Sequence, residues 1–254
     1  MKYSACVSAL FGGKPVEETL DTVKAAGLNQ YEFWSWWDQD TERILEAQQR
    51  TSLRPAAFCT RMVSLVESAH RNAYLDGLAE TAEVCRKLQC STVITQVGAE
   101  LKNVSRGKQH ESLAEGLKAC VPLLEKNDLT LVFEPLNTKI DHPGYYLTAS
   151  EEAFQLVDEV GSSRVKVLFD LYHQYITEGL NIERILKNLN KIGHFHVAGY
   201  PGRHEPLIHS EIDYPLILRA LSEAGFDRTV GLEYFPQEDA AYGLSALTQI
   251  LSPF

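Results

Sequence analysis

The second half of the chain carries four side chains of the types that bind divalent metal ions. Glu134, Asp170, His196 and Glu233 each stand at the end of a short run of apolar or β-branched residues, and each gap between them can hold a helix with two loops. One acidic residue at such a place commonly caps the next helix, but four converge if the runs are neighbouring strands of a parallel barrel. Because three carboxylates buried together need a cation between them, the pattern predicts a divalent-metal enzyme.

The types of ligand narrow the choice of metal and of chemistry. Three carboxylates and one imidazole without a thiolate suit Mn²⁺ or Mg²⁺, and Co²⁺ also fits, whereas structural Zn²⁺ sites favour cysteine. Four protein ligands leave two octahedral positions for neighbouring oxygens of an α-hydroxy carbonyl compound, whose enediolate the metal then stabilises. Glu134 and Glu233 are the expected catalytic pair, which removes and returns the substrate proton from opposite sides.

Three other polar residues lie close to these ligands in the sequence. We expect His173 in the loop after Asp170, where it either contacts a substrate hydroxyl or lies on the surface. Arg203 stands in a long polar loop and either binds a substrate carboxylate or hydroxyl, which arginine suits, or pins the loop through an ion pair. His194 shares a strand face with His196 but lies nearer the start of the strand, so we expect it in an inner layer of the barrel, and its contact with the site stays open.

An aromatic cluster and a cysteine complete the candidates. Trp34, Trp36 and Trp37 follow the second expected strand, where they either wall a pocket over the site or form a contact between subunits. Acidic barrels of this size are often dimers or tetramers, so we expect a homo-oligomer. Cys6, in the first expected strand, can approach the site, but nothing in the sequence marks it as a nucleophile.

Composition excludes several classes of partner. The 254 residues carry a net charge of −10, whereas binding to nucleic acid or to an anionic membrane requires a basic footprint. No apolar run reaches the about 20 residues of a membrane span. The five cysteines are odd in number and show no C-x-x-C spacing, which favours free thiols in a reducing compartment. Since the chain begins without a secretory signal pattern, we expect a cytoplasmic protein without nucleic-acid or membrane partners.

Short β-branched runs alternate with longer amphipathic runs along the whole chain. This order predicts a parallel sheet buried on both faces, and eight units in this length favour a single (β/α)8 TIM barrel over residues 1–254. The expected strands are 3–7, 30–34, 55–59, 92–96, 129–134, 165–170, 192–197 and 229–233. The expected helices are 15–26, 40–50, 68–89, 109–127, 148–159, 181–190, 212–224 and 239–251.

Several of these segments resemble the xylose-isomerase-like barrel superfamily, and within it the hydroxypyruvate isomerase family with its related 2-oxo-tetronate isomerases. The resemblance lies in Glu134-Pro-Leu-Asn, Asp170-Leu-Tyr-His, Gly193-His-Phe-His-Val-Ala-Gly with the following Pro201-Gly-Arg-His-Glu-Pro, and Gly231-Leu-Glu-Tyr. It implies an isomerase that converts hydroxypyruvate, or a related 2-oxo or 3-oxo acid, to tartronate semialdehyde or its counterpart. It also implies one metal on Glu134, Asp170, His196 and Glu233, proton transfer by the two glutamates, and substrate contacts from His173 and Arg203.

Three alternatives stay open at this point. Some relatives place Gln where His196 stands, so the ligand set also resembles the ketose 3-epimerases, which would use the same glutamates and metal on a sugar. These epimerases usually carry a further Glu where this chain has Ile140. A DNA-repair endonuclease with a zinc cluster would need more histidines and a basic groove. A sugar-binding barrel without catalysis would exchange no hydrogen at carbon.

Overall fold

The structure, a computed structural model, describes residues 1–207, 210–237 and 239–251. Within these ranges the chain alternates strands with helices. The strands are β1 Lys2–Cys6, β2 Gln30–Phe33, β3 Arg54–Cys59, β4 Thr92–Thr95, β5 Thr130–Phe133, β6 Val165–Asp170, β7 Ile192–Val197 and β8 Thr229–Leu232. The helices are α1 Val7–Leu10, α2 Val16–Ala25, α3 Thr41–Thr51, α4 Arg71–Leu88, α5 Arg106–Lys126, α6 Ser150–Val160, α7 Leu171–Glu178, α8 Ile182–Lys187, α9 Tyr214–Glu223 and α10 Ala240–Leu251, with 3₁₀ turns at Ser68–His70 and Leu189–Lys191.

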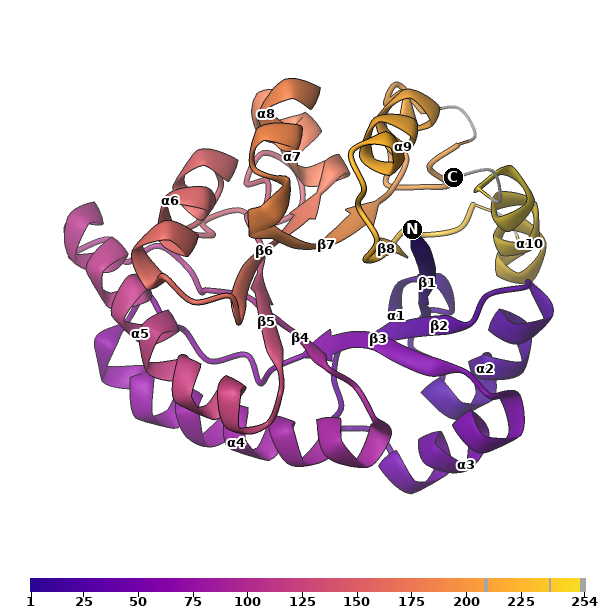
Figure 1. Cartoon of the computed structure of the whole chain (residues 1–254), viewed down its shortest axis with the longest axis horizontal. Helices are drawn as coiled ribbons and strands as arrows, with labels where there is room; N and C mark the ends of the chain where they lie inside the picture. Colours follow the sequence, from indigo (N-terminus) through magenta and orange to yellow (C-terminus); the bar gives the residue numbers. More distant parts are fainter. Residues whose placement is uncertain (208–209, 238, 252–254) are drawn as a thin grey trace.

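The strands close into a parallel barrel in chain order, and β8 pairs with β1. The helices surround this ring, and the colour of the chain runs once around it from β1 to α10 (Figure 1). The expected (β/α)8 TIM barrel is therefore confirmed. No helix in the described part of the chain is long and apolar enough to span a membrane.

Local signals explain where the helices begin and end. Pro15 precedes α2, and Glu17 and Glu18 stand in its first turn, where acidic side chains meet the positive end of the helix dipole. The Asp40 carboxylate accepts hydrogen bonds from the backbone N–H groups of Glu42 and Arg43 and so caps α3. Gly161 ends α6 with a φ of 67°, a left-handed conformation that glycine adopts without steric cost.

Two short helices lie where we expected no helix. α1 follows β1 directly, and α7 follows β6 directly. The expectation that His173 lies in a loop is wrong, because this residue belongs to the first turn of α7. The turn forms because the Asp170 carboxylate accepts hydrogen bonds from the N–H groups of Tyr172 and His173, at 2.7 and 3.2 Å.

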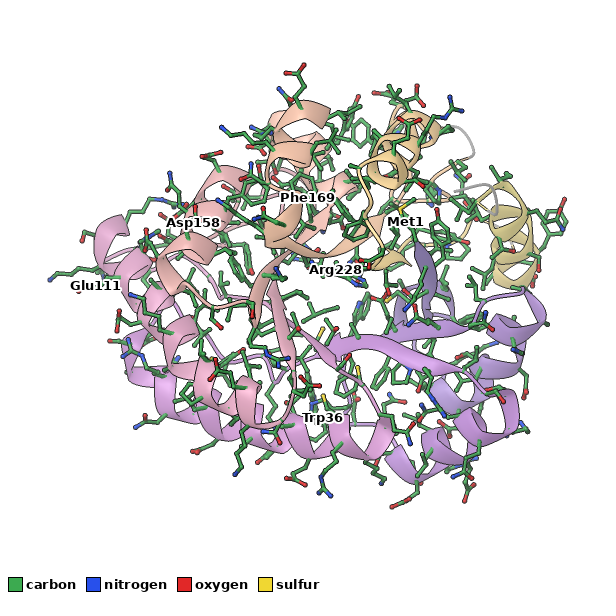
Figure 2. All side chains as sticks on the ribbon, viewed as in Figure 1. Met1, Trp36, Glu111, Asp158, Phe169 and Arg228 are labelled. Carbon is green, nitrogen blue, oxygen red and sulfur yellow. The ribbon has the colours of Figure 1, made fainter. Side chains whose placement is uncertain are left out.

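Two apolar layers hold the barrel together. Most buried apolar side chains pack between the strands and the surrounding helices, where sticks fill the space around Phe169 and Trp36 (Figure 2). A smaller cluster lies inside the barrel and contains Ala57, Cys59, Ile94, Val132 and Leu168. Since side chains alternate along a strand, the same inward rows that carry these residues also carry the polar groups of the site.

Candidate metal and substrate site

The structure brings the four expected ligands together at the C-terminal end of the barrel. Asp170 is the last residue of β6 and the register partner of His196, which is the last but one of β7, and Glu134 and Glu233 directly follow β5 and β8. One donor atom from each of the four lies within 4.8 Å of the others, and all four residues are buried. The His196 Nδ1 atom lies 3.4 Å from Glu233 Oε2 and 3.8 Å from Glu134 Oε1.

The donor atoms of this cluster fit a cation. Glu134 Oε1, Asp170 Oδ2 and His196 Nδ1 are buried and have no hydrogen-bond partner. Buried polar atoms rarely stay unpartnered, and leaving one so costs about 1–3 kcal/mol. Three such atoms that converge from three strands therefore form a site whose oxygen and imidazole donors suit a divalent metal.

Glu233 makes more contacts than the other carboxylates. Its Oε1 atom accepts a hydrogen bond of 2.7 Å from the indole N–H of Trp34, and its Oε2 atom accepts one from the guanidinium of Arg203. The Cys6 thiol lies 3.8 Å from the same Oε1 atom. Trp34 thus walls the site, whereas Trp36 bonds the Thr81 hydroxyl and packs against Arg61, away from the cluster.

The Arg203 guanidinium forms ion pairs with carboxylates of the cluster. Besides Glu233, its guanidinium lies 3.9 Å from Asp170 Oδ2 and 3.7 Å from Asp141 Oδ1. The residue is buried and has a φ of 58°, a left-handed backbone, and its carbonyl oxygen accepts a hydrogen bond of 2.8 Å from the N–H of Phe235. One of the two interpretations of Arg203 was an ion pair. Such a pair is present, and two of its carboxylate partners, Asp170 and Glu233, belong to the cluster.

Burial and neighbouring charges shift the pKa values of the ligands in different directions. Burial, together with Glu233 and Asp170, raises the pKa of Glu134 well above its usual value. Although burial also acts on Glu233, His196 and Arg203 lower its pKa well below the usual value. Burial opposes the charged form of His196, but Glu233 and Glu32 raise its pKa well above the usual value. The carboxylates of the cluster therefore cannot all be ionised unless a positive charge lies among them.

His173 lies beside the cluster rather than on the surface. Its Nδ1 atom is 2.6 Å from the side-chain amide nitrogen of Asn137, which donates, so the ring proton is assigned to Nε2. The Nε2 atom is buried, has no hydrogen-bond partner and lies 3.6 Å from Asp170 Oδ2. The interpretation of His173 as a surface residue is wrong, and an N–H group remains free to bind a ligand.

Glu32 in β2 is a buried acid that the sequence analysis missed. Its Oε1 atom lies 3.0 Å from Nε2 of His194, and its Oε2 atom lies 2.9 Å from Nε2 of His196. Burial raises the pKa of Glu32, but the two histidines lower it more, so the net shift is downward. The sequence feature that could have indicated Glu32 is a single acidic residue inside the expected strand, in the run Gln30-Tyr-Glu-Phe. His194 is an inner-layer residue, as expected, and it reaches the site through Glu32.

A cavity of about 270 Å³ opens above the cluster. Glu134, His173, His196, Arg203 and Glu233 line its polar side. Its apolar side is formed by Trp34, Cys59, Met62, Ile94, Leu136 and Phe235. An apolar cavity with a few convergent polar groups is the usual form of a site for a small molecule.

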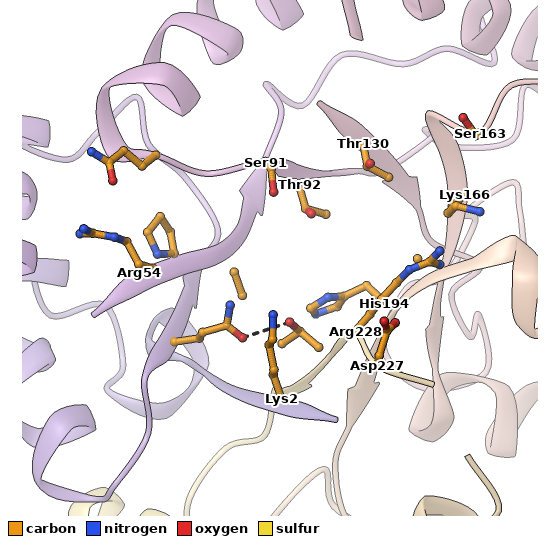
Figure 3. Close-up of a pocket in the computed structure, with 16 residues that line it drawn as sticks. Lys2, Arg54, Ser91, Thr92, Thr130, Ser163, Lys166, His194, Asp227 and Arg228 are labelled. Carbon is orange, nitrogen blue, oxygen red and sulfur yellow. Dashed lines mark hydrogen bonds between the residues drawn. The ribbon is translucent and has the colours of Figure 1, made fainter. Parts of the chain in front are cut away.

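A second cavity, of about 660 Å³, lies at the opposite end of the barrel, where the strands begin (Figure 3). Its labelled residues include Lys2, Arg54, Lys166, His194 and Arg228. The His194 ring reaches this cavity from inside the barrel (Figure 3). Ligand sites of such barrels lie at the C-terminal ends of the strands, so the smaller cavity is the candidate active site.

The chain matches the family of xylose isomerase-like TIM barrels over residues 20–250, and it belongs to that family. Its curated relatives include hydroxypyruvate isomerase of Escherichia coli strain K12, which is 28% identical over 253 residues and covers 96% of this chain and 97% of that protein. They also include 2-oxo-tetronate isomerase of Cupriavidus necator, which is 32% identical over 149 residues, 59% of this chain and 56% of that protein. The expected family and the expected enzyme class, an isomerase, are confirmed.

Among solved structures, the chain is similar to a protein from Brucella melitensis named AP endonuclease, family 2. The two superpose with a TM-score of 0.91 at 26% identity, over 100% of this chain and 98% of that one. The similarity again extends over the whole barrel.

Proposed function

We propose that the chain is a metal-dependent isomerase of hydroxypyruvate or a closely related 2-oxo or 3-oxo acid. The observation that carries this proposal is the set of unpartnered donor atoms on Glu134, Asp170 and His196, which converge with Glu233 on one small cavity. The names of the curated relatives, hydroxypyruvate isomerase and 2-oxo-tetronate isomerase, support the same class of substrate.

Glu134, Asp170, His196 and Glu233 would hold one divalent cation, Mn²⁺ or Mg²⁺, with Co²⁺ as a further candidate. When bound, the cation supplies a Lewis acid that stabilises negative charge on the substrate oxygens. The Arg203 guanidinium binds the substrate carboxylate, because it lines the cavity beside the cluster and suits such a group. His173 donates its Nε2–H to a substrate hydroxyl, since this atom has no other partner.

The two glutamates transfer the proton. One carboxylate removes a proton from C3 of hydroxypyruvate, and the electron pair of that bond forms the enediolate. The other glutamate delivers a proton to C2, while the hydroxyl proton moves from the C3 oxygen to the C2 oxygen, which leaves an aldehyde at C3. The product is tartronate semialdehyde, and no atom is gained or lost. A positioned acid or base of this kind contributes about 10²–10⁴-fold to the rate.

The test measures hydrogen exchange at carbon. The protein is stripped with EDTA, restored with Mn²⁺ and incubated in D₂O with hydroxypyruvate and a panel of ketoses, and NMR follows deuterium entry. We expect Mn²⁺-dependent labelling of hydroxypyruvate that falls at least 100-fold in Glu134→Gln. Glu17→Gln is the matched control, because Glu17 is a buried carboxylate that pairs with Arg43 on the outer helices. Absence of labelling in the wild-type protein would overturn the proposal.

The same experiment separates the alternatives. Labelling of a free ketose at C3, with none of hydroxypyruvate, would instead make the chain a ketose 3-epimerase that uses the same glutamates. The name of the Brucella melitensis protein raises the endonuclease alternative, so duplex DNA with an abasic site is incubated in parallel. We expect no cleavage, because the chain carries a net charge of −10.

The remaining expectations are proposals of the same kind. We propose one domain over residues 1–254, of which 208–209, 238 and 252–254 lie outside the described residues. We also propose a homodimer or homotetramer and a cytoplasmic location without nucleic-acid or membrane partners. All five cysteines are described, buried and free of disulfides, which suits a reducing compartment. Light scattering of the purified protein would measure the oligomeric state directly.

A further inference from the structure

A buried carboxylate that the proposed reaction does not use lies directly beneath the cluster. Glu32 is 1% exposed and comes from β2, on the far side of the barrel from β7. Its Oε2 atom is 2.9 Å from His196 Nε2, the ring nitrogen that points away from Glu134 and Glu233. The two nitrogens of one imidazole thus face two different groups of acids.

This contact decides which nitrogen of His196 can bind a metal. In the neutral ring that binds a metal, a carboxylate at hydrogen-bond distance from Nε2 keeps the one proton on that atom, which leaves the lone pair on Nδ1. The Nδ1 atom is the one without a hydrogen-bond partner, and it faces the carboxylates of the cluster. We propose that Glu32 is a positioning residue that fixes the tautomer and the ring orientation of His196 for metal binding through Nδ1.

Glu32 is itself held from both sides. Its Oε1 atom accepts hydrogen bonds from the Ser4 hydroxyl and from Nε2 of His194, at 3.0 Å in the latter case. His194 in turn borders the cavity at the opposite end of the barrel (Figure 3). A column of His194, Glu32 and His196 therefore crosses the inside of the barrel, and every link in it is a hydrogen bond.

Strand β8 leaves room for this column. Gly231 of β8 is the register partner of His196. A Cβ atom at position 231 would come within 2.5 Å of Glu32 Oε1 and 2.7 Å of His196 Cδ2. Any larger residue would push the carboxylate and the ring apart. The glycine thus permits the close approach on which the orientation of His196 depends.

Glu32, His194 and His196 are also close enough to bind a metal themselves. Their facing atoms, however, already satisfy one another through hydrogen bonds, whereas the unpartnered atoms lie in the other cluster. The two arrangements differ in one observable property. A metal between Glu32 and the histidines would displace the proton from His196 Nε2, whereas positioning by Glu32 requires that proton to stay.

The first test therefore needs no variant of Glu32. The wild-type protein is labelled with ¹⁵N-histidine and loaded with Zn²⁺, a diamagnetic probe, and the His196 signals are those that disappear in His196→Gln. We expect a proton on Nε2 and a Zn²⁺-dependent shift of Nδ1. A Zn²⁺-dependent shift of Nε2 with loss of its proton would overturn the proposal.

The second test measures Mn²⁺ affinity from the electron paramagnetic resonance signal of the free ion. Loss of a carboxylate behind a metal-bound histidine typically weakens metal binding 10–100-fold, so we expect that loss in Glu32→Gln and little change in Glu17→Gln. Glu32→Asp, which keeps the charge but cannot reach both rings, should give an intermediate loss. Unchanged affinity in folded Glu32→Gln would contradict the proposal.

The inference rests on the proposed metal centre, and the two fail in different ways. If the wild-type protein binds neither Mn²⁺ nor Zn²⁺, the proposed function and the inference are both overturned. If it binds metal with the expected His196 signals but labels no substrate in D₂O, only the proposed reaction is overturned. If it labels substrate and Glu32→Gln binds Mn²⁺ as the wild-type protein does, only the role of Glu32 is overturned.

Discussion

At the scale of single residues, the two proposed proton carriers differ in what they touch. Glu233 accepts hydrogen bonds from Trp34 and Arg203, whereas Glu134 Oε1 has no partner. Hydrogen bonds to a carboxylate favour its charged form, and desolvation without them disfavours it. Pairs of acids whose surroundings differ in this way are suited to opposite roles in one proton transfer.

Arg203 provides the sharpest residue-scale prediction about the substrate. If its guanidinium binds a substrate carboxylate, Arg203→Ala raises KM for hydroxypyruvate about tenfold or more, because a charge-assisted hydrogen bond contributes about 1.5–3 kcal/mol. A neutral ketose, when it is turned over, should show a smaller increase. Steady-state kinetics on both substrates measure the difference, with the exposed Arg50→Ala as control. Equal losses for both substrates would mean that Arg203 acts only through Glu233.

At the scale of elements, β8 sets the space inside the barrel. Gly231→Ala should lower the free energy of unfolding by about 1–3 kcal/mol and weaken Mn²⁺ binding, because the added methyl group meets Glu32 and His196. Gly107→Ala is the matched control, since open space surrounds that position in α5 and alanine is the better helix former by about 1 kcal/mol. Urea unfolding and Mn²⁺ titration measure both quantities. A Gly231→Ala variant with wild-type affinity would show that the column tolerates displacement.

The packing of α5 on α6 predicts a dependence of stability on pH. His110 in α5 contacts Glu152 and Glu159 in α6 at 3.2 and 3.0 Å, and Arg106 also binds Glu152. Burial lowers the pKa of His110, but the two carboxylates raise it more, so the net shift is upward. The stabilisation is therefore complete below the unfolded pKa of about 6.5 and is lost as the pH rises through the folded pKa.

Urea unfolding of the wild-type protein and of His110→Gln at several pH values measures this contribution. We expect the wild-type protein to be more stable by roughly 0.5 kcal/mol below pH 6, since the pair is partly exposed, and the difference to vanish at high pH. A difference that grows with pH would contradict the assignment of the charged form.

At the scale of the whole molecule, four strands on one side of the barrel meet at the cluster. A metal that binds only the native arrangement stabilises it by about 2.7 kcal/mol at 100 times its Kd. Mn²⁺ should thus raise the Tm of the EDTA-treated wild-type protein by several degrees, and the rise should disappear in His196→Ala but persist in Glu17→Gln. Differential scanning calorimetry measures the shift. Equal shifts in all three proteins would indicate nonspecific binding.

Much of this architecture could be predicted from the sequence, because it depends on local patterns. Apolar strands that alternate with amphipathic helices predict a parallel barrel, and caps such as Asp40 mark where helices start. Glu134, Asp170, His196 and Glu233 could be selected together because parallel strands of one barrel end on the same face, whatever the details of packing.

Which side chains meet across the barrel depends on the three-dimensional fold. Glu32 and His196 are 164 positions apart in sequence and touch because the sheet closes, which no local pattern encodes. Pairing of neighbouring strands brings Arg203, after β7, to Glu233, after β8, and His173, after β6, to Asn137, after β5. Residue type and strand order therefore determined which atoms could bind a metal. The register and closure of the barrel determined which of these atoms remain unpartnered and face one another.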